Sequence, residues 1–146
     1  MYIKQSELFM GTSMDFVKKF MDICAMSSHK KGEVLFREND PAKFFFILLS
    51  GRVRLSVGEP QQVVYNAECN GEAFGWSSLI GGDVYSASAE CLEPTKLLKT
   101  ASNKLSMILD EDTENGIIFF KQLAATLGNR LLETYKLVTP KIENLK

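Results

Sequence analysis

The sequence predicts a domain of the α+β class that is mainly β, a sandwich, roll or barrel of short strands flanked by helices. From about residue 30 to residue 100, short runs of apolar residues, or of alternating apolar and polar residues, are separated by frequent turn signals, as in small β domains. Before and after this region, apolar residues recur at helical spacing. The 146 residues can bury one core but are too few for two domains of ordinary size, so we expect a single domain over 1–146.

The first element is expected to be a short amphipathic helix over roughly 13–26. Thr12 or Ser13 can cap its N-terminus, because a hydroxyl accepts a hydrogen bond from a free backbone N–H in the first turn. This face should lie against a core. The apolar residues that define the face are Phe16, Phe20, Ile23 and Cys24.

Strands are expected next, because apolar runs of strand length alternate with polar breaks. Ser50-Gly51 joins two of these runs and predicts a β-hairpin. The glycine-rich segment 70–83 lacks strand alternation and predicts a loop with one helical turn. The expected strands lie at residues 34–36, 44–49, 53–57, 63–65, 86–91 and 95–99.

After Ser102 the pattern becomes helical again. A short helix is expected over 103–109, and a longer one starts at Asp112 or Thr113. An acidic cluster, Asp110 to Asp112 with Glu114, lies at its start, where negative charge interacts favourably with the N-terminal end of the helix dipole. Capping therefore explains this cluster without a metal. We expect this C-terminal helix over about 113–138, because the residue before a proline disfavours helical geometry and Pro140 follows.

The long helix carries an apolar seam with alternating steps of three and four residues, sustained for about three heptads. Such a seam favours pairing with a second copy of the chain, although it could instead pack on the β-roll of its own chain. The seam residues, which we predict to form a dimer interface, are Ile117, Phe120, Ala124, Leu127, Leu131, Thr134 and Val138.

This order of elements resembles the cyclic-nucleotide-binding domain family. Residues 31–40 resemble the family's opening strand and turn, and residues 45–53 its second signature. Residues 71–75 together with 86–89 match the family's phosphate-binding cassette. The resemblance implies a double-stranded β-helix (jelly-roll β-roll) over about 30–100, with an N-terminal helix and a long C-terminal helix. It also resembles the sensory half of catabolite-activator-like transcription regulators.

In that family the cassette binds a cyclic phosphate through backbone N–H groups at the start of its short helix and through an arginine. A glutamate of the cassette accepts a hydrogen bond from the ribose hydroxyl. The resemblance therefore assigns ligand binding to the matching segment of this chain. The candidate ligand-binding residues are Gly71, Glu72, Ala73, Phe74, Gly75, Trp76, Ser77, Ser78, Tyr85, Ser86 and Ala87.

Both charged anchors of the cassette are replaced in this sequence. Trp76 stands where the glutamate is expected and Tyr85 where the arginine is expected. An indole can only donate a hydrogen bond, and a neutral phenol cannot neutralise the charge of a phosphate. We expect cyclic AMP and cyclic GMP to bind weakly or not at all. The two aromatic rings either stack on a different, planar or apolar ligand, or fold inward and fill the pocket.

Other features exclude several classes of function. The net charge of −1 and the scattered basic residues argue against direct nucleic-acid binding, and no apolar run is long enough to cross a membrane. A cytoplasmic location is expected. The six residues after Pro140 are too few for a helix-turn-helix. We find no catalytic constellation, cofactor motif or metal-ligand spacing, which predicts a non-enzymatic protein without a cofactor.

The three cysteines are interpreted as buried thiols and His29 as a surface histidine. Asn129 and Arg130 lie where some family members close the pocket, but solvated helix positions are the expectation here. We expect a small-molecule-sensing module that acts on an unknown downstream protein. The alternatives are a ligand-free dimeric scaffold and the sensory fragment of a transcription regulator.

Overall fold

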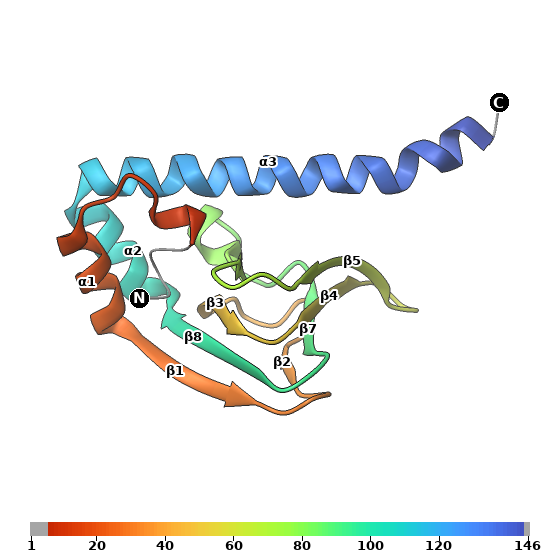
Figure 1. Ribbon diagram of the computed structural model, residues 1–146, viewed down its shortest axis with the longest axis horizontal. Helices are drawn as coiled ribbons and strands as arrows, with labels where there is room; N and C mark the ends of the chain where they lie inside the picture. Colours follow the sequence, from red (N-terminus) through yellow and green to blue (C-terminus); the bar gives the residue numbers. More distant parts are fainter. Residues whose placement is uncertain (1–5, 145–146) are drawn as a thin grey trace.

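The computed structural model describes the backbone of residues 6–144 and the side chains of residues 6–136, and it consists of two antiparallel sheets with helices at one end (Figure 1). Within these residues each sheet has four strands. The first sheet has the order β1-β8-β3-β6, with bounds Cys24–His29, Thr95–Ala101, Phe44–Ser50 and Ala73–Phe74. The second has the order β2-β7-β4-β5, with bounds Val34–Phe36, Ser88–Cys91, Val53–Val57 and Gln62–Ala67.

Three α-helices and two short 3-10 helices complete the described chain. Figure 1 shows α1 and α2 at one end of the roll, while α3 starts beside them and runs over the roll and beyond it. The two sheets and the flanking helices confirm the jelly-roll β-roll that the sequence predicted. The helices are η2 (Glu7–Phe9), α1 (Met14–Ile23), η3 (Ser77–Ile80), α2 (Ser102–Glu111) and α3 (Thr113–Asn144).

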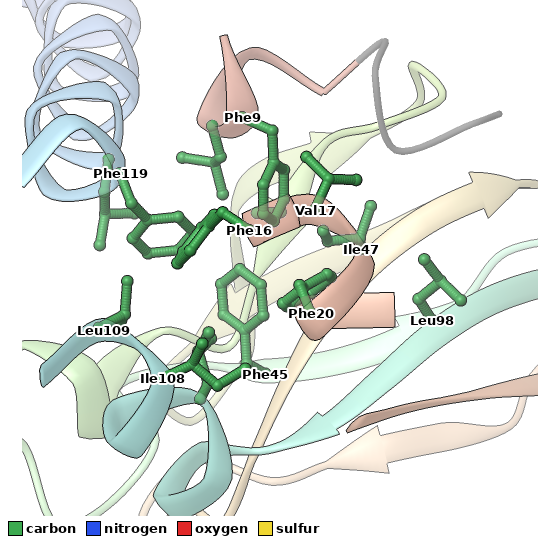
Figure 2. Close-up of a cluster of buried hydrophobic side chains, with 14 of the residues drawn as sticks. Phe9, Phe16, Val17, Phe20, Phe45, Ile47, Leu98, Ile108, Leu109 and Phe119 are labelled. Carbon is green, nitrogen blue, oxygen red and sulfur yellow. The ribbon is translucent and has the colours of Figure 1, made fainter. Parts of the chain in front are cut away.

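Strand β3 of the first sheet is apolar on both faces because it lies between two hydrophobic clusters. Along β3, Phe45 and Ile47 face the helices, whereas Phe46 and Leu48 face the second sheet. This two-sided burial explains the continuous apolar run of β3. We call the two groups the helix-side cluster and the inter-sheet cluster. Figure 2 shows the helix-side cluster, in which side chains of α1, α2 and α3 meet those of the first sheet.

A polar clamp ties the starts of α1 and α3 together. Ser13 caps α1 by accepting a hydrogen bond from the Phe16 N–H at 3.2 Å, as expected. Asp112 caps α3 in the same way, with its Oδ1 3.1 Å from the Asn115 nitrogen. The Asn115 side chain accepts from the Ser13 N–H at 2.9 Å and donates to Asp112 Oδ2 at 2.8 Å. These hydrogen bonds from Asn115 lower the pKa of Asp112.

The structure corrects the C-terminal ends of two predicted helices, the first and the last. The first helix ends at Ile23, and Cys24–His29 form strand β1, paired along its length with β8. The prediction of helix to residue 26 was wrong because pairing with the distant β8 overrides the local pattern. The last helix was expected to end before Pro140 but continues to Asn144. A proline removes one helical hydrogen bond and kinks the helix, and Figure 1 shows α3 bending near this end.

The cysteines were expected to be buried, and only Cys91 is fully so. Cys24 is half-buried, with its sulfur 2.8 Å from the Thr100 hydroxyl, and burial raises its pKa to about 11. Cys69 is exposed, so that part of the prediction was wrong.

In the part of the chain with described side chains, no helix is long and apolar enough to cross a membrane.

Candidate functional site

The segment that the sequence singled out connects β6 to β7 through the single turn of η3. Gly75 begins it with a φ of +76°, and a β-carbon there would lie 3.0 Å from the ring of Phe46. A glycine is therefore required for the chain to turn so close to the sheet. The helical turn ends at Gly81, which has a φ of +92°. The Ser78 hydroxyl on this turn is buried and has no hydrogen-bond partner.

Tyr85 is packed into the inter-sheet cluster. Its side chain is 3% exposed, and its ring stacks on Phe36 with the centroids 3.8 Å apart. The hydroxyl donates to the Phe44 carbonyl at 2.7 Å and accepts from the Phe44 N–H at 3.0 Å. Burial raises the pKa of Tyr85, so the ring stays neutral. Both the ring and the hydroxyl are thus committed to contacts within the protein.

Trp76 lies on the other side of the first sheet, against the helix-side cluster. The guanidinium of Arg130 from α3 stands 4.4 Å from the Trp76 ring centroid and 4.2 Å from that of Tyr65. Arg130 also donates to the Ala73 carbonyl at 2.6 Å, and its side chain is only 14% exposed. The expectation of a solvated Arg130 was wrong, because its guanidinium finds partners on the roll. Its neighbour Asn129 is exposed.

Glu72 supplies the negative charge next to this cation. One carboxylate oxygen accepts a hydrogen bond from the Tyr65 hydroxyl and lies 3.9 Å from Arg130 Nη2. The other accepts from the backbone N–H groups of Glu68 and Cys69, each at 2.8 Å. Burial and the hydrogen bond to Glu72 raise the pKa of Tyr65 to about 12. Burial lowers the pKa of Arg130, against the opposing effect of Tyr65 and Glu72.

A cavity of about 280 Å³ lies beside this group, between η2, the turn from β5 to β6, and α3. Tyr65, Glu72 and Arg130 form part of its wall. The cavity therefore brings together polar side chains from the roll and from the long helix. Such a half-open space next to convergent polar groups is a typical small-molecule site.

The structure divides the predicted site residues between two locations. Trp76 contacts the helix-side cluster and Tyr85 belongs to the inter-sheet cluster, so the two rings do not meet. Gly71, Ala73 and Phe74 are buried, and the side chain of Glu72 lies next to Arg130. Ser77 and Ala87 are half-buried and Ser86 is exposed.

Sequence reasoning missed Tyr65 and undervalued Arg130. The alternation of β5 placed Tyr65 on a strand but gave no indication of its partner. For Arg130 the available signal was the resemblance, which marks this part of the last helix as pocket-closing. A solvated helix position is the default for arginine, and only the docking of α3 makes this one an exception.

The seam residues of α3 differ in their surroundings. Ile117, Phe120 and Leu131 are exposed, whereas Leu127 packs against the helix-side cluster. Ala124 and Thr134 are also exposed, and the Val138 side chain lies outside the described residues. An apolar groove of about 520 Å³ between α2 and the start of α3 includes Ile117, Phe120 and Ala124 in its wall.

The geometry defines a class of protein: a β-roll that carries a short glycine-flanked cassette and is closed by a long C-terminal helix. Among the described residues, no group of three or more His, Cys, Asp or Glu side chains is arranged to hold a metal ion. The model of the cyclic nucleotide-binding domain family matches residues 26–112, which is more than half of the chain. The chain belongs to the cyclic nucleotide-binding domain family.

Known proteins agree with this assignment. A cyclic nucleotide-binding protein from Geobacter metallireducens is 27% identical, with a TM-score of 0.76 over 85% of this chain and 91% of that one. A cyclic nucleotide-binding domain from Methylobacillus flagellatus shares the fold with a TM-score of 0.82 at 23% identity, over 96% of this chain and 80% of that one. Human cGMP-dependent protein kinase 2 is 25% identical over 117 residues, which are 78% of this chain and 14% of the kinase.

Proposed function

We propose that this domain is a non-enzymatic regulatory module in which cyclic AMP and cyclic GMP bind weakly or not at all. The observation that carries the proposal is the packing of Tyr85. At the position where the resemblance implies an arginine, the structure has a neutral ring stacked on Phe36, with its hydroxyl bonded to Phe44. This side chain offers no positive charge to a phosphate, and its hydrogen bonds are already used.

The second anchor position supports the same proposal. Trp76 stands where a ribose acceptor is implied, and its indole can only donate a hydrogen bond. Its ring also lies close to the Arg130 guanidinium. Each charge-assisted hydrogen bond is worth about 1.5–3 kcal/mol. Losing both weakens binding by roughly two to four powers of ten.

The module would signal through α3. Arg130 joins this helix to Ala73 of the cassette, so a ligand that changes this contact changes the docking of α3. We propose that a small molecule of different chemistry acts at this site and that a downstream protein responds to α3. The exposed seam residues of α3 support a homodimer as the working form.

The first test is titration of the purified protein with cyclic AMP and cyclic GMP by calorimetry. We expect no micromolar binding and at most a small rise of the melting temperature at about 1 mM nucleotide, because bound ligand would stabilise the fold. Micromolar affinity for either nucleotide would contradict the proposal.

A gain-of-function pair makes the test sharper. The double variant Trp76→Glu, Tyr85→Arg restores both implied charges, and Trp76→Gln, Tyr85→Gln is the uncharged control. We expect the charged variant to bind cyclic AMP at least about tenfold more tightly than the control, if both melt cooperatively. Equal affinities in the two variants would show that the missing charges do not explain the weak binding.

A ligand-free dimeric scaffold is the second candidate. It is favoured by the filled position of Tyr85 together with the exposed apolar seam on α3. A thermal-shift screen against metabolites separates the two candidates. A saturable rise in melting temperature supports the sensor, and no response across the screen favours the scaffold.

A further inference from the structure

The guanidinium of Arg130 lies in a cage that is built entirely by the β-roll. Two aromatic faces, Tyr65 from β5 and Trp76 from the loop before η3, stand 4.2 Å and 4.4 Å from its central carbon. The carboxylate of Glu72 lies 3.9 Å from Nη2. The cage and its cation therefore come from separate elements, because Arg130 belongs to α3.

The chemistry of the cage selects a cation. Aromatic faces attract guanidinium and ammonium groups, and the attraction grows when the site is shielded from water. Glu72 adds a negative charge that is fixed independently of Arg130, by the Tyr65 hydroxyl and by the N–H groups of Glu68 and Cys69. Without Arg130 the cage would keep this charge and its two ring faces. A phosphate or carboxylate would be repelled there.

The resident cation is incompletely bonded. Nη2 donates to the Ala73 carbonyl, but Nη1 is buried and has no hydrogen-bond partner. The cavity of about 280 Å³ beside the cage gives a small molecule access to Tyr65 and Glu72. A guest that fills both the cage and the cavity can thus make contacts that the arginine side chain does not.

We infer that Tyr65, Trp76 and Glu72 form a binding site for a guanidinium or alkylammonium cation, and that Arg130 is its exchangeable internal occupant. The guest has the opposite charge to a cyclic nucleotide. Its binding displaces Arg130 and removes the hydrogen bond between α3 and Ala73. The inference rests on the proposed function, since it names the ligand class of the regulatory site.

The test compares the wild-type protein with Arg130→Met, which empties the cage of its cation and keeps an unbranched stem on α3. Trp76 is the single tryptophan of the sequence, so its fluorescence reports on the cage directly. The probes are methylguanidinium and tetramethylammonium chloride, with sodium chloride at matched ionic strength. We expect saturable fluorescence changes in Arg130→Met and at least about tenfold weaker binding in the wild type, where the internal cation competes.

The double variant Arg130→Met, Glu72→Gln removes the negative charge of the cage and should bind the same probes at least about tenfold more weakly than Arg130→Met. Sodium acetate should produce no saturable change in any variant. The inference is overturned if Arg130→Met binds the cations no more tightly than the wild type, or if Glu72→Gln has no effect. Should Arg130→Met fail to melt cooperatively, Arg130→Gln replaces it, because it also removes the cation but keeps a polar end on the side chain.

The cation could be a free small molecule or the arginine of another protein, and a peptide arm distinguishes these sources. If the capped tripeptide Gly-Arg-Gly binds the wild type at least about tenfold more tightly than methylguanidinium, the guest is an arginine side chain; otherwise it is the free cation. The cyclic-nucleotide titration is independent of both arms. Micromolar cyclic AMP binding overturns the proposed function, whereas absence of cation binding overturns only the cage.

Discussion

At the residue scale, Tyr85 shows how one neutral side chain can stabilise a site that a charged one would keep open. Its ring fills the space beside Phe36, and its hydroxyl completes the hydrogen bonding of the Phe44 backbone at the start of β3. An arginine at this position would need an anion as a partner, because a buried unpaired charge is costly. The tyrosine needs none, which makes the fold independent of a bound phosphate.

This contact gives the residue-scale prediction. Tyr85→Phe keeps the ring stack but leaves the N–H of Phe44 without its hydroxyl partner. We expect the free energy of unfolding to fall by about 1–3 kcal/mol. Urea denaturation followed by circular dichroism measures this change, and an unchanged m-value shows that the native fold is kept. A loss below about 0.5 kcal/mol would mean that water replaces the hydroxyl.

At the scale of elements, α3 depends on a close approach to α2. Gly116 is buried at this crossing, and a β-carbon there would lie 2.5 Å from the Leu109 carbonyl oxygen. The second glycine of the helix, Gly128, is exposed, and a β-carbon there meets nothing within 4 Å. The two glycines therefore differ in purpose: one permits packing, and the other only weakens the helix.

The two glycines form a matched pair for mutation. Gly116→Ala should destabilise the protein by about 1–3 kcal/mol, because the added methyl group forces α2 and α3 apart. Gly128→Ala should stabilise it by about 0.5–1 kcal/mol, because alanine loses less backbone entropy in a helix. Thermal melts of both variants show whether each substitution lowers or raises the melting temperature. Equal effects of the two substitutions would contradict the described packing of α3 on α2.

At the scale of the whole molecule, the apolar seam of α3 predicts a homodimer. Leu131 lies on the seam and is 51% exposed, whereas Leu132 lies off the seam and is 57% exposed. We expect Leu131→Asp to produce a monomer in sedimentation-velocity experiments, because a charge in a heptad core is costly to bury. Leu132→Asp is the control and should leave the dimer intact. A monomeric wild type would contradict the predicted dimer, and dissociation by the control alone would place the interface elsewhere.

Much of the fold was predictable because its signals are local. The turn at Ser50-Gly51, the caps at Ser13 and Asp112 and the glycine-rich cassette all follow from neighbouring residues. Strand β1 was missed because its stability comes from pairing with β8, some 70 positions later in the chain. The contacts of Arg130 were missed for a similar reason. They depend on how α3 crosses the roll, which no local pattern encodes.

The clamp at Asn115 gives α3 the mechanics of a lever. Ser13 and Asp112 hold the beginning of the helix, and Gln122 donates to the Met10 carbonyl further along it. Its side-chain attachment to the β-roll itself is Arg130, about 22 Å from Asn115 along the axis. The end of the helix at Asn144 is about 44 Å from the same pivot when measured along the helix. A rigid tilt that moves Arg130 by one ångström would therefore move the far end by roughly two, so a small displacement at the roll is amplified toward the C-terminal end of α3.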